Sequence, residues 1–453
     1  MFGGIAAVVK QFRRNWAREL DDGVLRRAFR DVGHHWRERK LDPVTTVRLF
    51  FLQIVSGNTA CNDVPRLSKL NVTGSAYCEA RKRLPLEALQ VLVARCTSRM
   101  MESARDSGRW LGHRLFIVDG SSFSMPDTAE LREHFGQHGS QREGCGFPVA
   151  HWLALVHFGS GLLRKTLTSP LRTHDMGPTS RLHPSLEADD VLLGDRAFCS
   201  FVHVALLAAQ RVHAVLRIHQ RVVVSFRPHR KHAMPGRGKK RGSQKGLPRS
   251  RWLRKLGPQD QIVEWFKPEH RPAWLSEAEF AALPDTLQVR ELRYRVSRPG
   301  YRTREVTLVT TLLNAAVYTA EELAKAYRLR WTIETSFRHI KSTMKMDVLH
   351  CRTLDGVLKE LTMFVLVYNM VRMTMLEAAK RQQIEPDRIS FVDALRWLRN
   401  AQPGDELPKL KVNPSRNDRY EPRVRKRRPK SYPLMTQPRE RLKQLLAAKK
   451  IAA

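Results

Sequence analysis

The chain has 453 residues, 42% of them hydrophobic, which is enough for two or three domains and a sizeable core. Its formal net charge is +36, from 80 Lys and Arg against 44 Asp and Glu. An excess of this size excludes an ordinary neutral surface and indicates a polyanionic partner, with nucleic acid ahead of an acidic membrane surface. A basic protein without such a partner is the remaining alternative.

From the apolar segments and the cysteines we expect a cytoplasmic protein. The longest apolar run, 361–376, is interrupted by Asn369 and Arg372 and falls short of a bilayer span. Residues 1–9 are apolar but lack the charged region and cleavage site of a signal peptide. The six cysteines include no C-x-x-C pair, so we expect reduced thiols and no structural zinc. No membrane association is expected.

Residues 1–110 are predicted to be helical. Helices are expected over 44–55 and 64–70, with a turn over 58–62 between them. A third helix, capped by Thr73 or Ser75, ends before Pro85 and carries a basic run of Arg81, Lys82 and Arg83. Three short helices with a basic last one suit a helix-turn-helix-like DNA-binding domain, and an ordinary helical bundle with a solvated basic face is an equal alternative.

From residue 111 the pattern changes to strands, in an order typical of α/β domains. The predicted strands are 115–118, 151–158, 162–167, 191–194 and 213–218, with a helix over 201–210 before the last of them.

Residues 219–313 interrupt this order. The segment 227–255 contains twelve basic residues and no acidic one, so it is predicted to be a loop or a segment that orders on binding. Strands are expected over 287–296 and 306–313, which makes the interruption a β-rich insertion with a basic loop. A helix begins near Thr319, where Glu322 completes a capping box. Beyond Glu360 we expect an apolar helix, then a polar linker from about 401 and a basic tail over 423–430.

Two aspartates are candidate metal ligands. Asp119 and Asp195 are each predicted to end a short apolar strand and begin a turn. Cleavage of a phosphodiester by metal ions needs carboxylates that converge from different elements, and strand ends are where open α/β sheets build sites. Either aspartate alone is more simply a turn former.

A predicted helix over 327–341 supplies a third carboxylate. Tyr327, Arg330, Glu334 and Lys341 are spaced by three, four and seven residues, which places them within roughly 60° of one another on a helix. A second stripe is apolar and is expected to pack on the sheet; its members are Leu329, Ile333, Phe337, Ile340 and Met344. From spacing alone, a surface helix with ion pairs is an equal alternative.

The pattern Y-x2-R-x3-E-x6-K resembles the signature of the YREK group (insertion-sequence family four) of bacterial DDE transposases. Both aspartates, in Ile117-Val118-Asp119-Gly120-Ser121 and Leu193-Gly194-Asp195-Arg196, and the position of the insertion agree with that resemblance. It covers roughly residues 111–365. It implies an α/β, ribonuclease-H-like mixed sheet flanked by helices over 111–365, interrupted by the β-rich insertion 219–313. An N-terminal helical domain over 1–110 and a C-terminal helix and basic tail over 366–453 complete the expected organisation.

The resemblance also implies an activity, namely hydrolysis at the transposon end followed by attack of the freed 3′-hydroxyl on target DNA. Asp119, Asp195 and Glu334 would be the catalytic carboxylates and hold two Mg²⁺ ions, with Mn²⁺ as a substitute. The remaining candidates would contact DNA: Tyr327, Arg330, Lys341, Trp331 and Arg338. The implied partners are double-stranded DNA, as terminal repeats and target, and a second copy of the chain in the synaptic complex. The implied location is the cytoplasm, in association with the nucleoid.

Two other functions and one further site stay open at this point. A ribonuclease-H-like nuclease without strand transfer would carry similar residues, and so would a non-catalytic basic DNA-binding protein. Some relatives stack a flipped base on a tryptophan of the insertion, and the insertion here holds Trp252, Trp265 and Trp274. For each of these alone, a place in the core of the insertion is the simpler interpretation.

Overall fold

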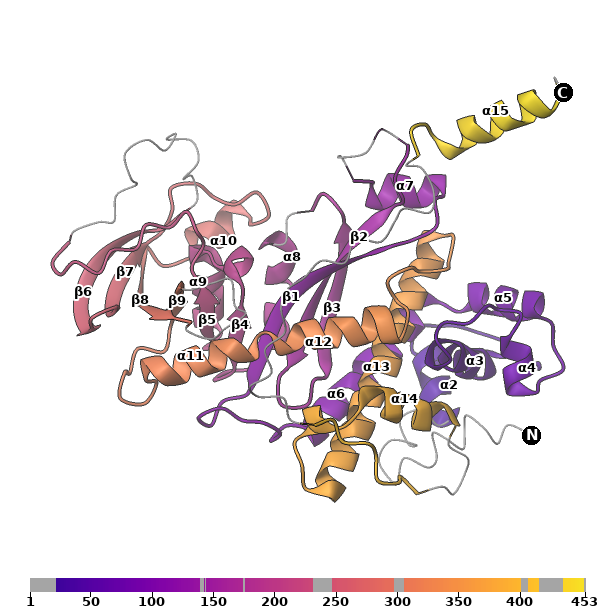
Figure 1. Cartoon of the computed structure of the whole chain (residues 1–453), viewed down its shortest axis with the longest axis horizontal. Helices are drawn as coiled ribbons and strands as arrows, with labels where there is room; N and C mark the ends of the chain where they lie inside the picture. Colours follow the sequence, from indigo (N-terminus) through magenta and orange to yellow (C-terminus); the bar gives the residue numbers. More distant parts are fainter. Residues whose placement is uncertain are drawn as a thin grey trace.

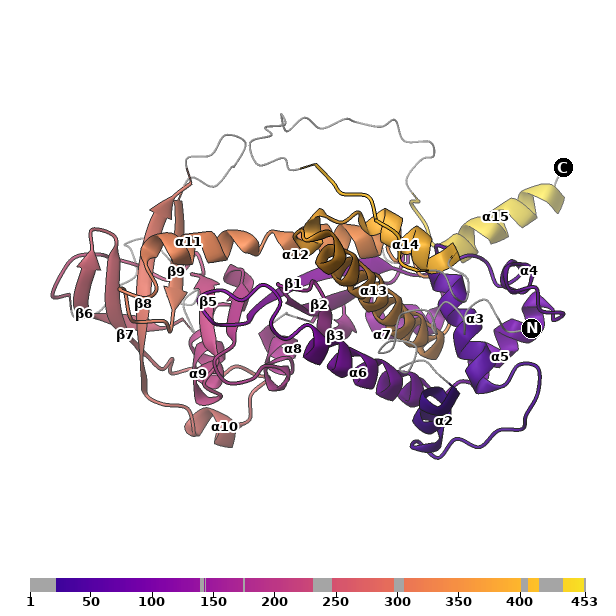
Figure 2. The same ribbon diagram turned by 90° about the horizontal axis from the view of Figure 1, so that it is seen from below.

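The structure is a computed structural model. It describes residues 22–138, 142, 144–173, 176–230, 247–296, 305–400, 406–414 and 435–451. One sheet of nine strands, in the order β3-β2-β1-β4-β5-β9-β8-β7-β6, passes through the described part. Helices cover both of its faces: α11 and α12 lie on one side, and α6 and α9 on the other (Figure 1, Figure 2).

The first five strands have the ribonuclease-H arrangement. They are β1 (Leu115–Ser124), β2 (Val149–His157), β3 (Leu163–Pro170), β4 (Val191–Gly194) and β5 (His213–Arg217). β2 pairs antiparallel with β1 and β3, whereas β1, β4 and β5 are mutually parallel. α9 (Phe201–Ala209) makes the crossover from β4 to β5. The predicted α/β, ribonuclease-H-like fold class is confirmed.

The insertion extends this same sheet. β9 (Glu305–Thr310) pairs with β5, and β8 (Thr286–Arg295), β7 (Asp260–Phe266) and β6 (Arg249–Gly257) follow as antiparallel neighbours. A short helix, α10 (Glu277–Ala281), joins β7 to β8. The prediction of a loop over 227–255 was wrong for its last part, because Arg249–Gly257 is an edge strand whose arginines point to solvent. Residues 231–246 of that segment lie outside the described residues.

The three short N-terminal helices predicted from the sequence are present as α3 (Pro43–Val55), α4 (Val64–Ser68) and α5 (Gly74–Arg83). Asp42 and Thr73 cap α3 and α5 by accepting backbone N–H bonds. α2 (Asp22–Arg30) and α6 (Leu86–Ser103) flank them. Of the basic run on α5, Lys82 and Arg83 are exposed, whereas Arg81 is buried.

The helix predicted over 327–341 is divided into three segments, which corrects the single helix expected. They are α11 (Ala320–Leu329), α12 (Thr332–Arg338) and a π-helical turn over His339–Thr343. Between α11 and α12 the backbone hydrogen bonds are of the i→i−3 type of a 3-10 helix instead of the i→i−4 type. One example runs from the N–H of Arg330 to the carbonyl of Tyr327. The chain is therefore overwound at the junction and underwound after α12. The two helices run end to end across the sheet (Figure 1).

A long helix, α13 (Leu354–Gln382), lies at the centre of the molecule. It packs against α3, α6, β3, α7 (Ala129–Phe135) and α14 (Phe391–Asn400). By length and composition it is the one helix of the described residues that could cross a membrane, but 89% of its apolar window is buried inside the protein. One continuous apolar core joins the N-terminal helices, the sheet and α13. The remaining helices are α8 (Met176–Ser180) and α15 (Arg439–Ile451); the basic run 423–430 lies outside the described residues.

Candidate functional site

The register of the parallel strands brings the two aspartates together. The last pair between β1 and β4 is Val118 with Gly194, so Asp119 and Asp195 follow side by side on neighbouring strands. Asp195 ends its strand as predicted. Asp119 does not, because β1 continues to Ser124 through its pairing with β2, in which Asp119 lies opposite Ala154. Asp119, which was expected at the end of a strand, is therefore the residue at which β1 stops pairing with β4 while it still pairs with β2.

The Asp119 carboxylate is held from both oxygens. Its Oδ1 accepts the backbone N–H of Gly120 at 2.8 Å, and its Oδ2 accepts Nη1 of Arg330 at 2.9 Å. Burial raises the pKa of Asp119, with further upward contributions from the charges of Asp195 and Glu334; the Gly120 and Arg330 contacts act against the shift. The three acidic side chains thus share one electrostatic environment.

Arg330 and Tyr327 lie inside the molecule, not on an exposed polar face. Arg330 is only 5% exposed, and its Cζ lies 4.7 Å from the ring centroid of Trp331 and 5.7 Å from that of Tyr327. The Tyr327 hydroxyl and Nε of Arg330 are buried and have no hydrogen-bond partner of normal geometry among the described residues. Burial also raises the pKa of the Tyr327 phenol, which therefore keeps its proton. Both atoms are therefore enclosed by the protein close to the Asp119–Arg330 contact.

The other motif residues are placed along the same helices. Lys341 extends back to β1, where its Nζ donates to the carbonyl of Ser122 at 2.6 Å and to Oγ of Ser121 at 3.3 Å. Glu334 is exposed, one turn after Arg330. Trp331, which is 43% exposed, and Arg338 lie on the outward side of α12. The structure places Arg330 in contact with Asp119 and sets Asp195 beside Asp119. Glu334 is exposed and contributes to the raised pKa of Asp119, and Lys341 contacts β1 from the π-helical turn.

The donor set suits a hard divalent cation, since every candidate ligand offers carboxylate oxygen. In the described part of the chain, however, no three His, Cys, Asp or Glu side chains lie close enough together to hold a metal ion. The Arg330 guanidinium occupies the space beside Asp119 Oδ2. The chemistry of the ligands therefore fits Mg²⁺, but the side chains must close around it.

Sequence reasoning missed the residues that support this site. The Ser121 hydroxyl and the Ser122 carbonyl anchor Lys341, and they follow Asp119 by only two and three residues. A polar Ser-Ser pair two residues after an acidic residue in a strand was the available signal.

The insertion tryptophans have different environments. Trp265 is fully buried and its Nε1 donates to Oε1 of Glu291 at 3.0 Å, so it belongs to the core of the insertion. Trp274 is stacked on His203, with ring centroids 5.2 Å apart. Trp252 is half-buried against His229, on the edge strand. Of the three, Trp265 has no ring face left for a base.

A mixed sheet in this strand order, with one aspartate in β1 and another directly after the neighbouring β4, is typical of the ribonuclease-H-like class of nucleic-acid-processing proteins. Comparison with known families narrows the class. Residues 110–370, more than half of the chain, match the family model described as the transposase DDE domain. The chain belongs to this family and is a DNA transposase.

Individual relatives agree with the family. The transposase InsG of insertion sequence element IS4 from Escherichia coli (strain K12) is 26% identical over 383 residues, which cover 80% of this chain and 78% of InsG. InsZ of the same strain, described provisionally as a transposase, is 27% identical over 164 residues, covering 32% of this chain and 52% of InsZ. The resemblance to DDE insertion-sequence transposases of family four is confirmed.

Among solved structures, the chain is similar to the piggyBac transposase in a synaptic complex with hairpin DNA. The TM-score is 0.42 at 9% identity, and the similarity covers 88% of this chain and 80% of that one.

Proposed function

We propose that Asp119, Asp195 and Glu334 are the catalytic carboxylates of this transposase and that they hold two Mg²⁺ ions, or Mn²⁺ as a substitute. The observation that carries the proposal is the β1–β4 register, which sets Asp119 beside Asp195 while Glu334 acts on the pKa of Asp119. When bound, the ions supply activation of the attacking oxygen and stabilisation of the leaving oxygen.

The remaining motif residues bind and orient DNA. Arg330 holds its guanidinium on Asp119, with Tyr327 packed beside it, so a phosphate that enters meets a fixed positive charge. Lys341, fixed on β1, adds a positive charge at the far end of the site. The reaction is hydrolysis at the transposon end and then attack of the freed 3′-hydroxyl on target DNA, in a cut-and-paste sequence.

The proposal is tested with purified full-length protein, Mg²⁺, a target plasmid and DNA that carries the terminal repeats of the element. Asp119→Asn and Glu334→Gln are each expected to lower the rate of cleavage by about 100-fold or more, because the charge that positions the reaction is lost. Glu321→Gln is the matched control, since Glu321 is an exposed acid of α11 that forms an ion pair with Lys325. Cleavage retained in either site variant would contradict the assignment, and cleaved DNA without joined products would favour the nuclease alternative.

Two further parts of the proposal concern binding. The N-terminal helices α3 to α5 contact DNA through the exposed Lys82 and Arg83, and the chain acts as a homodimer that bridges two transposon ends on nucleoid DNA. Sedimentation of the protein with one or two terminal-repeat duplexes per complex measures the second statement; a complex that stays at one chain and one duplex contradicts it.

A further inference from the structure

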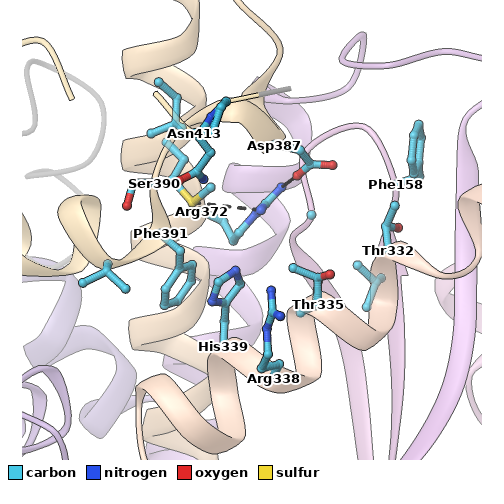
Figure 3. Close-up of a pocket in the computed structure, with 17 residues that line it drawn as sticks. Phe158, Thr332, Thr335, Arg338, His339, Arg372, Asp387, Ser390, Phe391 and Asn413 are labelled. Atoms are coloured by element: carbon cyan, nitrogen blue, oxygen red, sulfur yellow. Dashed lines mark hydrogen bonds and ion pairs between the residues drawn. The ribbon is translucent and has the colours of Figure 1, made fainter. Parts of the chain in front are cut away.

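A pocket of about 600 Å³ lies on the side of α12 that faces away from Glu334. Its walls are α12, the π-helical turn after it, α13, the turn between β2 and β3, and the segments 387–392 and 413–414. Figure 3 shows Arg338, the last residue of α12, and His339, the first of the π-helical turn, extending into the space below Arg372. A pocket of this volume is large enough for one nucleotide unit.

The pocket carries an uncompensated positive charge. Arg372 is buried and already paired, because it donates to Oδ1 of Asp387 at 2.8 Å and to the carbonyl of Ser160 at 2.9 Å. Arg338 is exposed and has no hydrogen bond or ion pair with any described residue. One carboxylate therefore faces two guanidinium groups, and the charge left over is that of Arg338.

His339 adds a neutral polar group to the same space. Burial, together with the charges of Arg338 and Arg372, lowers the pKa of His339 to about 4, so its imidazole is uncharged at neutral pH. Its Nδ1 is buried and has no hydrogen-bond partner among the described residues. Its ring is stacked on Phe391, with centroids 4.2 Å apart and planes at 9°. Since the stacked ring cannot easily rotate, the unpaired nitrogen is fixed in place.

The exposed side of α12 connects this pocket to the carboxylates. At about 100° per residue, His339 and Thr332 lie on the side opposite Glu334, while Arg338 lies about 40° from Glu334. Thr335, which is exposed and also lines the pocket, lies between Arg338 and the pocket floor. A strand that leaves Glu334 therefore passes Arg338 before it reaches the pocket.

We propose that this pocket binds one sugar–phosphate unit of the DNA strand that runs from the carboxylates across α12, with the phosphate on Arg338 and the sugar beside Thr335 and His339. The proposal rests on the proposed function only in taking DNA as the strand, and it does not depend on which residues perform the cleavage. Arg338 is then a DNA-binding residue through this pocket and not through the carboxylate site.

The test measures DNA binding in a Glu334→Gln background, which prevents turnover. Fluorescence anisotropy with a labelled terminal-repeat duplex is recorded over a series of salt concentrations for Arg338→Gln. The expected result is a 5- to 10-fold larger Kd at low salt, about the contribution of one phosphate contact. The slope of log K against log salt concentration, called the salt slope below, should be smaller by about one unit. Arg338→Lys is expected to restore most of the salt slope because it keeps the charge.

Two variants separate the pocket from general surface charge. Arg105→Gln removes an equal charge from an arginine that is already paired with Glu102 and Glu187, so no change in Kd is expected. Thr335→Trp fills the pocket without altering charge and is expected to weaken binding about as much as Arg338→Gln. Equal Kd values for Arg338→Gln and Arg105→Gln, or tight binding by Thr335→Trp, would overturn the proposal.

A free nucleotide is the other source of the same chemistry. The full-length protein is titrated with deoxyadenosine monophosphate by calorimetry, beside the DNA measurement. If the mononucleotide binds, and binding is lost in Arg338→Gln while DNA affinity and salt slope are unchanged, the pocket is a small-nucleotide site and the proposal is wrong. Loss of DNA affinity in Arg338→Gln together with active cleavage by Glu334→Gln would retain this proposal and refute only the catalytic assignment.

Discussion

Replacing Asp119 by alanine should destabilise the protein as well as inactivate it, because Arg330 would lose its partner. The two groups meet at 2.9 Å, with side chains 23% and 6% exposed for Asp119 and Arg330. Leaving one member of a buried pair unpaired costs about 3–5 kcal/mol, and because Asp119 is partly exposed we expect a loss of about 3 kcal/mol. Arg330→Met removes the charge at issue, so the double variant should recover about 2 kcal/mol of the summed loss.

The coupling is measured by urea denaturation of the wild type, both single variants and the double variant, in EDTA. A matched cycle on Glu321 and Lys325 uses an ion pair of nearly equal length, 3.0 Å, on an exposed helix face, and should show a coupling of no more than about 0.5 kcal/mol. If the losses for Asp119→Ala and Arg330→Met simply add, within about 0.5 kcal/mol, the two side chains do not act as a buried pair and the reasoning fails.

Three further predictions concern stability. Burial lowers the pKa of His157 to about 4, so between pH 6.5 and about 4 the unfolded chain binds a proton that the folded chain does not. The Tm should therefore fall as the pH is lowered through this range, and it should fall less in His157→Gln. Gly194→Ala would place its Cβ 2.9 Å from Leu216, and calorimetry should show a loss of about 1–3 kcal/mol; an unchanged Tm would contradict it. Trp265→Ala should cost about 3–5 kcal/mol in chemical denaturation, and the half-buried Trp252 clearly less; equal losses would argue against the packing described.

The strands that were predicted correctly are those whose side chains are buried. Val191–Gly194 is apolar on both faces, and a short apolar run before a turn identifies it directly. β6 was missed because Arg249 and Arg251 face solvent on an edge strand, so composition resembles a loop. Asp119 was predicted to end a strand because the apolar residues, which mark the buried part of β1, stop at Val118. The strand continues through backbone pairing with β2, which leaves no trace in side-chain type.

For the candidate site, the sequence suggested members but not their geometry. The spacing from Tyr327 to Glu334 selected the candidates, whose roles stay a prediction, but a regular helix of 3.6 residues per turn was assumed. The helix is instead interrupted at Arg330 by i→i−3 bonds, Arg330 and Tyr327 are buried, and Arg330 contacts Asp119, a residue 211 positions earlier. Such a long-range contact depends on how α11 and α12 lie on the sheet, which no local pattern contains.

The central position of α13 fixes the distance between the N-terminal helices and the sheet. The same helix packs against α3 and α6 at the N-terminal end of the chain and against β3 of the catalytic sheet. Because these parts share one core, a DNA site read by the N-terminal helices would lie at a constant separation from Asp119 and Asp195. This constant separation would then set the number of base pairs between the recognised sequence and the cut.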